Sequence, residues 1–193
     1  MGIISRFPAG ATKPYIEETY NSDGQLISAN MYGHDAIRDY AFFYCTNLAL
    51  TSLPSGITSI GISAFEGCSS LALTSLPNGI TSIGDTAFYD CTNLALTSLP
   101  SGITSIGISA FTNCSSLALT SLPIGITSIG NSAFRNCSSL VSLTFEGTPE
   151  RIGGNTFTNC NNLTTINVPW AEGAVANAPW GATNATIHYG HTG

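Results

Sequence analysis

Residues 48–70 read LALTSLPSGITSIGISAFEGCSS, and residues 71–93 repeat them almost letter for letter as LALTSLPNGITSIGDTAFYDCTN. Two further units, 94–116 and 117–139, keep the same Leu, Pro, Gly, Ile, Ala-Phe and Cys positions at the same step of 23 residues. Self-similarity at a fixed period of this size is typical of a solenoid, in which neighbouring coils bury a shared core. The units therefore predict a stack of similar layers.

The repeat extends beyond these four near-identical units in both directions. Residues 36–47 are the second half of a degenerate first unit, 140–162 are a drifted unit, and a half-unit opens at Leu163. Cysteine and phenylalanine keep the 23-residue step throughout, at Cys45, Cys68, Cys91, Cys114, Cys137 and Cys160 and at Phe42, Phe65, Phe88, Phe111, Phe134 and Phe157. This period lies within the roughly 20–29 residues of leucine-rich repeats. We therefore expect a β-rich leucine-rich-repeat solenoid over residues 36–168.

Different sequences flank the repeat, and we interpret them as caps. In residues 1–35, the runs YIEETY and QLISAN surround Asn-Ser-Asp-Gly, and two extended runs around an Asp-Gly turn are typical of a β-hairpin. Residues 169–193 hold both tryptophans, Trp170 and Trp180, which are expected to cover the last layer of the core while ATIHYG pairs with the last strand edge. Such caps protect the open ends of a solenoid from aggregation.

Within one unit, residue types predict which side chains face the core. Leu53, Ile60 and Phe65 are expected to point inward and to stack on their copies, with a short strand on each long side of the coil. Gly56 and Gly61 are expected at turns, where glycine tolerates positive φ. An exposed residue recurs directly above itself, so a repeated charge would form a destabilising ladder of like charges. This explains why only 8% of the residues are charged.

Composition excludes several classes of function. The net charge of −6 and the five scattered Lys and Arg residues leave no basic face for a nucleic acid or an anionic membrane. No stretch approaches the roughly 18 apolar residues of a transmembrane helix, so membrane insertion is not expected. The opening MGIISRFPAG lacks the apolar core of a signal peptide. We expect that an export signal has been lost, that the protein is released by another route, or that it stays inside the cell.

The six cysteines have three interpretations. Because each is a copy of one structural position, their even number carries no information about pairing. Stacked copies would lie about 5 Å apart, within the range for a disulfide, but equivalent side chains point the same way and a bridge needs converging Cβ vectors. Buried free thiols that act as small apolar fillers are the favoured interpretation. Disulfides and a metal site are the alternatives.

The repeat anchors resemble the BspA-like leucine-rich repeat family, also called the Treponema pallidum type. CNNLTTINVP at residues 160–169 matches the first half of the family's repeat, and PIGITSIGNSAFRNC at 123–137 matches the second half. The resemblance covers roughly residues 36–169. It implies a bacterial or protist surface protein linked to adhesion to host matrix or other cells, and hence an extracellular or cell-surface location. It supplies no catalytic residues.

The four central units depart from the family pattern at one position. The family has an apolar residue three positions after the first Leu, as in Leu143, whereas the central units have Thr there and a Leu one position earlier. Either the segment bulges so that this Leu reaches the core, or the row is an exposed hydrophobic patch that marks an interaction site. Burial is the favoured interpretation. The row comprises Leu50, Leu73, Leu96 and Leu119.

No pattern in the sequence supports catalysis, a cofactor or a bound metal. The histidines, His34, His188 and His191, lie outside the repeat, and the many serines have no neighbouring base. The candidate binding face is a double row of hydroxyls. It comprises Thr51, Ser52, Thr74, Ser75, Thr97, Ser98, Thr120 and Ser121. A structural ladder and an ice-binding threonine array are the alternative interpretations of these rows.

The sequence therefore favours a non-enzymatic interaction module, a monomer or weak oligomer whose rigid repeat strand face binds a protein or polysaccharide. The alternative is a structural spacer in a phage or cell-surface assembly. The hydroxyl rows are identical in the four units, which fits recent duplication, a spacer or a periodic ligand. Variation falls at other positions, for example the one that holds Ile62, Asp85, Ile108 and Asn131 in successive units.

Overall fold

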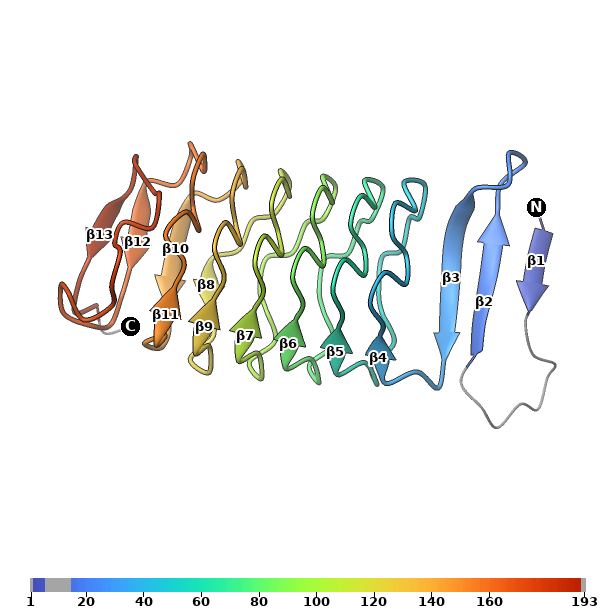
Figure 1. The fold of residues 1–193 in the computed structure, drawn as a ribbon, viewed down its shortest axis with the longest axis horizontal. Coiled ribbons are helices and arrows are strands. Elements are labelled where there is room, and N and C mark those ends of the chain that lie inside the picture. The colour runs from blue at the N-terminus through green and yellow to red at the C-terminus, as the bar shows by residue number, and fades with distance from the viewer. Residues whose placement is uncertain (1, 6–14, 192–193) are drawn as a thin grey trace.

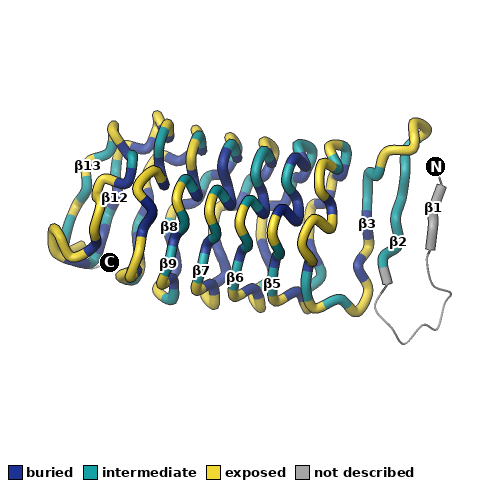
Figure 2. Tube along the Cα trace, in the orientation of Figure 1, coloured by how far each residue is buried: buried dark blue, intermediate teal, exposed yellow. Residues whose placement is uncertain are grey.

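The computed structural model describes residues 2–5 and 15–191. Its layers stand side by side along one axis, with three N-terminal strands at one end and the C-terminal segment at the other (Figure 1). Figure 2 shows a similar succession of buried and exposed segments in each layer. Over the described ranges the regular elements are strands, and no helix there is long and apolar enough to cross a membrane. The predicted β-rich solenoid is confirmed.

One long side of the stack is a parallel sheet with one short strand per layer. Its strands are β4 (Ala36–Ile37), β5 (Ser59–Ile60), β6 (Ser82–Ile83), β7 (Ser105–Ile106), β9 (Ser128–Ile129) and β11 (Arg151–Ile152). Neighbouring strands are in register at a step of 23 residues, so Ile83 lies between Ile60 and Ile106. Each isoleucine is buried while the residue before it faces outward, as the two-residue period of a strand requires.

The other long side forms a sheet only toward the C-terminus. Its parallel strands are β8 (Ser121–Leu122), β10 (Ser142–Phe145), β12 (Thr165–Asn167) and β13 (Thr186–His188). In the units from residue 48 to 116, the LALTSL segments form no strand. Their contact is a backbone hydrogen bond such as that from the Ala72 N–H to the Leu50 carbonyl oxygen, at 3.0 Å. The prediction of a strand on each long side is therefore wrong for these units.

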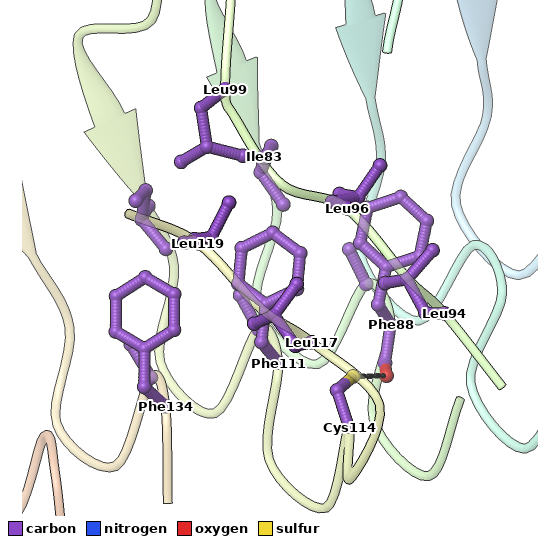
Figure 3. Close-up of a cluster of buried hydrophobic side chains, with 14 of the residues drawn as sticks. Ile83, Phe88, Leu94, Leu96, Leu99, Phe111, Cys114, Leu117, Leu119 and Phe134 are labelled. Carbon is purple, nitrogen blue, oxygen red and sulfur yellow. Dashed lines mark hydrogen bonds between the residues drawn. The ribbon is translucent and has the colours of Figure 1, made fainter. Parts of the chain in front are cut away.

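The spacing of the inward leucines explains this difference. Leu94, Leu96 and Leu99 are all buried, so Thr97 and Ser98 both lie outside between the second and third of them. A strand alternates its side chains between two faces, so it cannot bury residues three apart without a bulge. The row formed by Leu50, Leu73, Leu96 and Leu119 is buried, as predicted, and none of its side chains is more than 7% exposed. Leu96 and Leu119 are shown in Figure 3.

A column of stacked phenylalanines runs through the core. The six rings from Phe42 to Phe157 lie nearly parallel, with neighbouring centroids 5.2–5.6 Å apart. Figure 3 shows three of them, Phe88, Phe111 and Phe134. Beside the column, all six cysteines are free, and all but Cys45 are buried. Each of the five buried thiols donates a hydrogen bond to a phenylalanine carbonyl, 26 residues earlier in the chain.

The glycine after each short strand has a different role from the one expected. Gly61 and its copies do not have positive φ. Instead, a Cβ on Gly107 would stand 2.5 Å from the amide nitrogen of Asp85 in the preceding layer, so the layers meet here through bare backbone. Positive φ is found at other positions, including Ser63 and Asn113.

The N-terminal segment contains the predicted hairpin. β2 (Tyr15–Tyr20) and β3 (Leu26–Tyr32) pair antiparallel, and β1 (Gly2–Ser5) adds a third strand on the far side of β2. The Ala49 N–H donates to the Ile27 carbonyl oxygen at 3.0 Å and joins β3 to the first repeat.

The C-terminal segment closes onto the last layers. β13 pairs with β12, as predicted for ATIHYG. Trp170 and Trp180 are buried, and both indoles contact the Phe145 ring. The boundaries 1–35, 36–168 and 169–193 and the capping roles stay predictions. Residues 1, 6–14 and 192–193 of the predicted end segments lie outside the described residues.

Candidate functional site

The predicted hydroxyl rows lie together on one side of the stack, and we call them the hydroxyl face. Seven of the eight residues are exposed, and Ser121, which begins β8, is half-buried. The bulged segment positions each pair. Leu96 and Leu99 are anchored in the core and leave the Thr97 and Ser98 side chains outside.

Within the part of the chain that the structure describes, the hydroxyls of this face have almost no partners. Ser121 donates to Oε1 of Glu146 at 2.8 Å. Among the described residues, no hydrogen bond engages the hydroxyls of the other seven residues. These side chains therefore do not form a structural ladder, and their hydroxyls can donate to and accept from a ligand.

A second threonine row shows how a structural ladder differs from this face. Oγ1 of Thr104 donates to the Thr81 carbonyl oxygen at 3.2 Å, and Oγ1 of Thr127 donates to the Thr104 carbonyl oxygen at 3.0 Å. Thr58 and Thr81 make the same kind of bond to the layer before them. We call Thr58, Thr81, Thr104 and Thr127 the framework row, because each hydroxyl ties its layer to the previous one.

Asparagine forms a further ladder at the turns before Cys114, Cys137 and Cys160. Nδ2 of Asn136 donates to Oδ1 of Asn113 at 2.5 Å, and Nδ2 of Asn113 donates to Oδ1 of Asp90 at 2.5 Å. Asn159 extends the ladder to Asn136 at 2.9 Å. Amides can both donate and accept, so they form the ladder that repeated charges could not.

The thiol column is chemically quiet at neutral pH. Burial raises the pKa of the Cys68 thiol to about 12 and that of Cys160 to about 11, and it raises the pKa of the three thiols between them well above the usual value. A neutral thiol is neither a nucleophile nor a metal ligand. Over the part of the chain that the structure describes, no cluster of His, Cys, Asp or Glu residues could hold a metal ion.

The histidines do not meet in one place. His34 follows β3 at the N-terminal end of the stack, whereas His188 lies in β13 and His191 follows it at the other end (Figure 1). His34 therefore cannot form a common site with His188 and His191.

A groove that the sequence did not reveal runs along the six-stranded sheet. It has a volume of about 420 Å³ and a floor of glycines, and we call it the glycine groove. The serines of β6, β7 and β9 line one wall, and the variable position lines the other. The floor comprises Gly61, Gly84, Gly107 and Gly130, and the variable wall comprises Asp39, Ile62, Asp85 and Ile108. In the sequence, the groove could have been suspected from a glycine that is the same in every unit next to a position that varies. Only the packing of the layers shows that these residues line one groove.

A second groove lies at the N-terminal end of the hydroxyl face. Its volume is about 430 Å³, and it separates β3 from residues 49–54. Thr51 and Ser52 are part of its lining. The hydroxyl face therefore continues into a concave surface at this end.

The fold and its 23-residue layers define a leucine-rich-repeat domain. Residues 35–169 match the BspA type leucine rich repeat region in six copies, and the chain belongs to this family. A comparison with curated proteins found no match.

Three of the solved structures that are similar to this chain are of bacterial proteins. The leucine rich repeat protein TpLRR of T. pallidum is 27% identical, with 84% of each chain covered and a TM-score of 0.61. A leucine rich cell surface protein from Faecalibacterium prausnitzii is 23% identical, with 86% of this chain and 54% of that chain covered and a TM-score of 0.54. The pneumococcal vaccine antigen PcpA is 18% identical, with 86% and 46% covered and a TM-score of 0.58. The likeness to the last two concerns the fold alone.

Proposed function

We propose that this chain is a non-enzymatic, adhesin-like interaction module that binds a protein or glycan through the hydroxyl face. The observation that supports the proposal is the contrast between the two threonine rows. The framework hydroxyls bond to the protein's own carbonyls, whereas those of Thr74, Thr97 and their neighbours are exposed and unpartnered within the described residues.

The scaffold behind the hydroxyl face supports a binding role. The stacked phenylalanines, the thiol bonds and the framework row connect each layer to the next. A surface that is already ordered loses little conformational freedom when a ligand binds. The rows themselves carry no charge, so they suit neutral hydrogen-bonding groups such as glycan hydroxyls and peptide amides.

A cell-surface location belongs to the same proposal. The similar protein from F. prausnitzii is named as a cell surface protein, and PcpA is named as a vaccine antigen. These names support an extracellular setting for this chain as well.

The proposal is tested by binding of the purified, fluorescently labelled chain to extracellular-matrix proteins, mucin glycans and intact bacterial cells. The matched variant is Thr74→Val with Thr97→Val, which removes two hydroxyls and keeps the shape of the side chains. We expect saturable binding to at least one member of the panel, weakened in the variant. Undiminished binding by the variant would contradict the assignment to this face.

The spacer alternative is favoured by the near-identical sequences of the four central units. A spacer needs no tailored surface, so duplication would leave its units alike. Absence of binding to every member of the panel, with an unchanged circular dichroism spectrum, would support the spacer and contradict the interaction module.

A further inference from the structure

The glycine groove lies on a different side of the stack from the hydroxyl face, because it follows the sheet that contains β5, β6, β7 and β9 (Figure 1). The floor of the groove consists of positions at which only glycine fits. A Cβ on Gly84 would stand 2.6 Å from the carbonyl carbon of Gly61, and one on Gly130 would stand 2.5 Å from the amide nitrogen of Ile108. At these positions the layers therefore pack through bare backbone, which leaves room for no side chain.

The variable wall of the groove alternates acidic and apolar residues. Asp39, Ile62, Asp85 and Ile108 occupy the same position in four successive layers. Ile62 is 42% exposed and Ile108 is 50% exposed. Single exposed apolar side chains are common on protein surfaces. Here, however, they alternate with carboxylates along one wall of a groove, which is a pattern that a ligand of matching alternation could recognise.

The two carboxylates have a structural role that does not need their charge. Oδ1 of Asp39 accepts a hydrogen bond from the Ile62 N–H at 2.7 Å, and Oδ1 of Asp85 accepts one from the Ile108 N–H at 2.7 Å. Asn131 makes the same contact with a neutral amide oxygen, which accepts from the Gly154 N–H at 3.3 Å. An amide therefore suffices for the fold.

The negative charge at this wall is all the more informative because charges are rare in the repeat. Residues 48–139 contain four charged side chains, namely Glu66, Asp85, Asp90 and Arg135. The chain as a whole has a net charge of −6, which attracts cationic partners over a longer range. The groove thus presents an acidic, partly apolar surface to its ligand.

We propose that the glycine groove binds an extended peptide with a basic residue at every third position, in the polyproline II conformation. Layers in a parallel stack lie about 4.8 Å apart, so Asp39 and Asp85, two layers apart, are separated by about 9.6 Å along the groove. One turn of polyproline II contains three residues, rises about 9.3 Å and returns a side chain to the same face. In a β-strand, residues three apart face opposite sides, so that conformation does not fit.

The rest of the groove fits the same ligand. The residues between the two basic positions lie over Ile62, which offers an apolar contact for proline rings. Arg151 lies beside Ser128 in the sheet and lines the C-terminal end of the groove. The basic residues of the peptide are therefore favoured beside Asp39 and Asp85 rather than at that end.

The test measures binding of the full chain to acetyl-(Pro-Pro-Lys)₃-amide by isothermal titration calorimetry. We expect saturable binding that weakens as salt is added, because the ion pairs are exposed. Acetyl-(Pro-Pro-Glu)₃-amide keeps the conformation with the opposite charge, and a peptide with three lysines spaced four residues apart changes the spacing alone. Both are expected to bind more weakly. Equal binding of either control peptide, or no binding of the first, would overturn the proposal.

The matched protein variant is Asp39→Asn with Asp85→Asn, which keeps the Oδ1 contacts and removes both charges. We expect binding to weaken by about threefold or more, the size expected from two exposed ion pairs, with an unchanged melting temperature. Thr74→Val with Thr97→Val should leave this binding unchanged, so a failure of the groove and a failure of the hydroxyl face are distinguishable. Binding lost in the threonine variant but kept in the asparagine variant would overturn the proposal.

Discussion

Sγ of Cys114 donates a hydrogen bond to the carbonyl oxygen of Phe88 at 3.0 Å (Figure 3). The other four buried thiols make the equivalent bond at 2.9–3.1 Å. Cysteine at this position therefore does more than fill space, because its thiol gives a second hydrogen bond to a carbonyl of the preceding layer that already accepts from the Cys91 N–H. Repetition of this bond turns the thiols into a row of links along the solenoid.

These thiols predict a loss of stability in alkali. Their folded-state pKa is raised by burial, to about 11 for Cys160 and about 12 for Cys68, above the ordinary value of 9.0. Above pH 9 the unfolded chain therefore binds fewer protons than the folded one, and the free energy of unfolding falls as pH rises. Each thiol contributes a slope of up to about 1.4 kcal/mol per pH unit.

The measurement is urea unfolding between pH 7 and pH 11. The expected result is a constant stability below pH 9 and a steep fall above it. Cys114→Ala is the control. We expect it to be less stable than the parent at every pH, but its free energy of unfolding should fall less steeply above pH 9, because one buried thiol is missing. A slope that Cys114→Ala leaves unchanged would show that other groups control the alkaline transition.

Two glycines of one unit should differ in their response to replacement by alanine. A Cβ on Gly107 meets backbone atoms at 2.5 Å, whereas the nearest atom to a Cβ on Gly102 is the Ile80 carbonyl oxygen at 3.7 Å. We expect Gly107→Ala to lower the free energy of unfolding by about 1–3 kcal/mol through overpacking. Gly102→Ala should stay within about 0.5 kcal/mol of the parent. Denaturant unfolding compares the two, and similar losses would disprove the close approach at Gly107.

The asparagine ladder allows its side-chain and backbone roles to be separated. Asn113 has a φ of 64° and bonds to Asp90 and Asn136 through its side chain. Asn113→Gly removes the ladder bonds but accepts the left-handed backbone, as Gly67 does at the equivalent position with a φ of 74°. Asn113→Ala removes the ladder bonds and also disfavours the left-handed backbone, so we expect it to be about 1–2 kcal/mol less stable than Asn113→Gly. Equal melting temperatures would show that the backbone conformation is not strained.

The bulge predicts a sharp difference between adjacent residues. Leu96 is fully buried and Thr97 is exposed. We expect Leu96→Ala to lower the free energy of unfolding by about 2–5 kcal/mol through loss of packing and creation of a cavity. Thr97→Ala should change it by less than about 0.5 kcal/mol. A large loss of stability for Thr97→Ala in denaturant titrations would mean that Thr97, rather than Leu96, faces the core.

The period of the sequence was enough to predict the layers, their register and their core. Copies of Ile60 and Phe65 stack because every layer repeats the same inward positions. Sequence also predicted the burial of the Leu96 row, since leaving four stacked leucines in water is unfavourable. It also raised the bulge, but it did not predict that the LALTSL segments of residues 48–116 would form no strand, because a bulge disrupts strand pairing only locally.

The sequence identified both threonine rows, but it did not show which of them bonds to the protein itself. Thr97 and Thr104 are the same residue type, and both are exposed. Only the position of a carbonyl in the preceding layer decides that Thr104 has a partner and Thr97 has none among the described residues. The glycine groove was hidden for a similar reason, because its walls come from residues in separate layers.

The central claim is that the framework row holds the layers while the hydroxyl face is free to bind. The most direct test compares Thr104→Val with Thr127→Val against Thr74→Val with Thr97→Val, by urea unfolding and by binding to the panel member that the parent chain recognises. We expect the framework variant to lose about 1–3 kcal/mol of stability, at about 0.5–1.5 kcal/mol for each of its two hydrogen bonds, and to keep its binding. The hydroxyl-face variant should keep its stability and lose binding. Equal effects of the two variants on both quantities would contradict the division of roles between the rows.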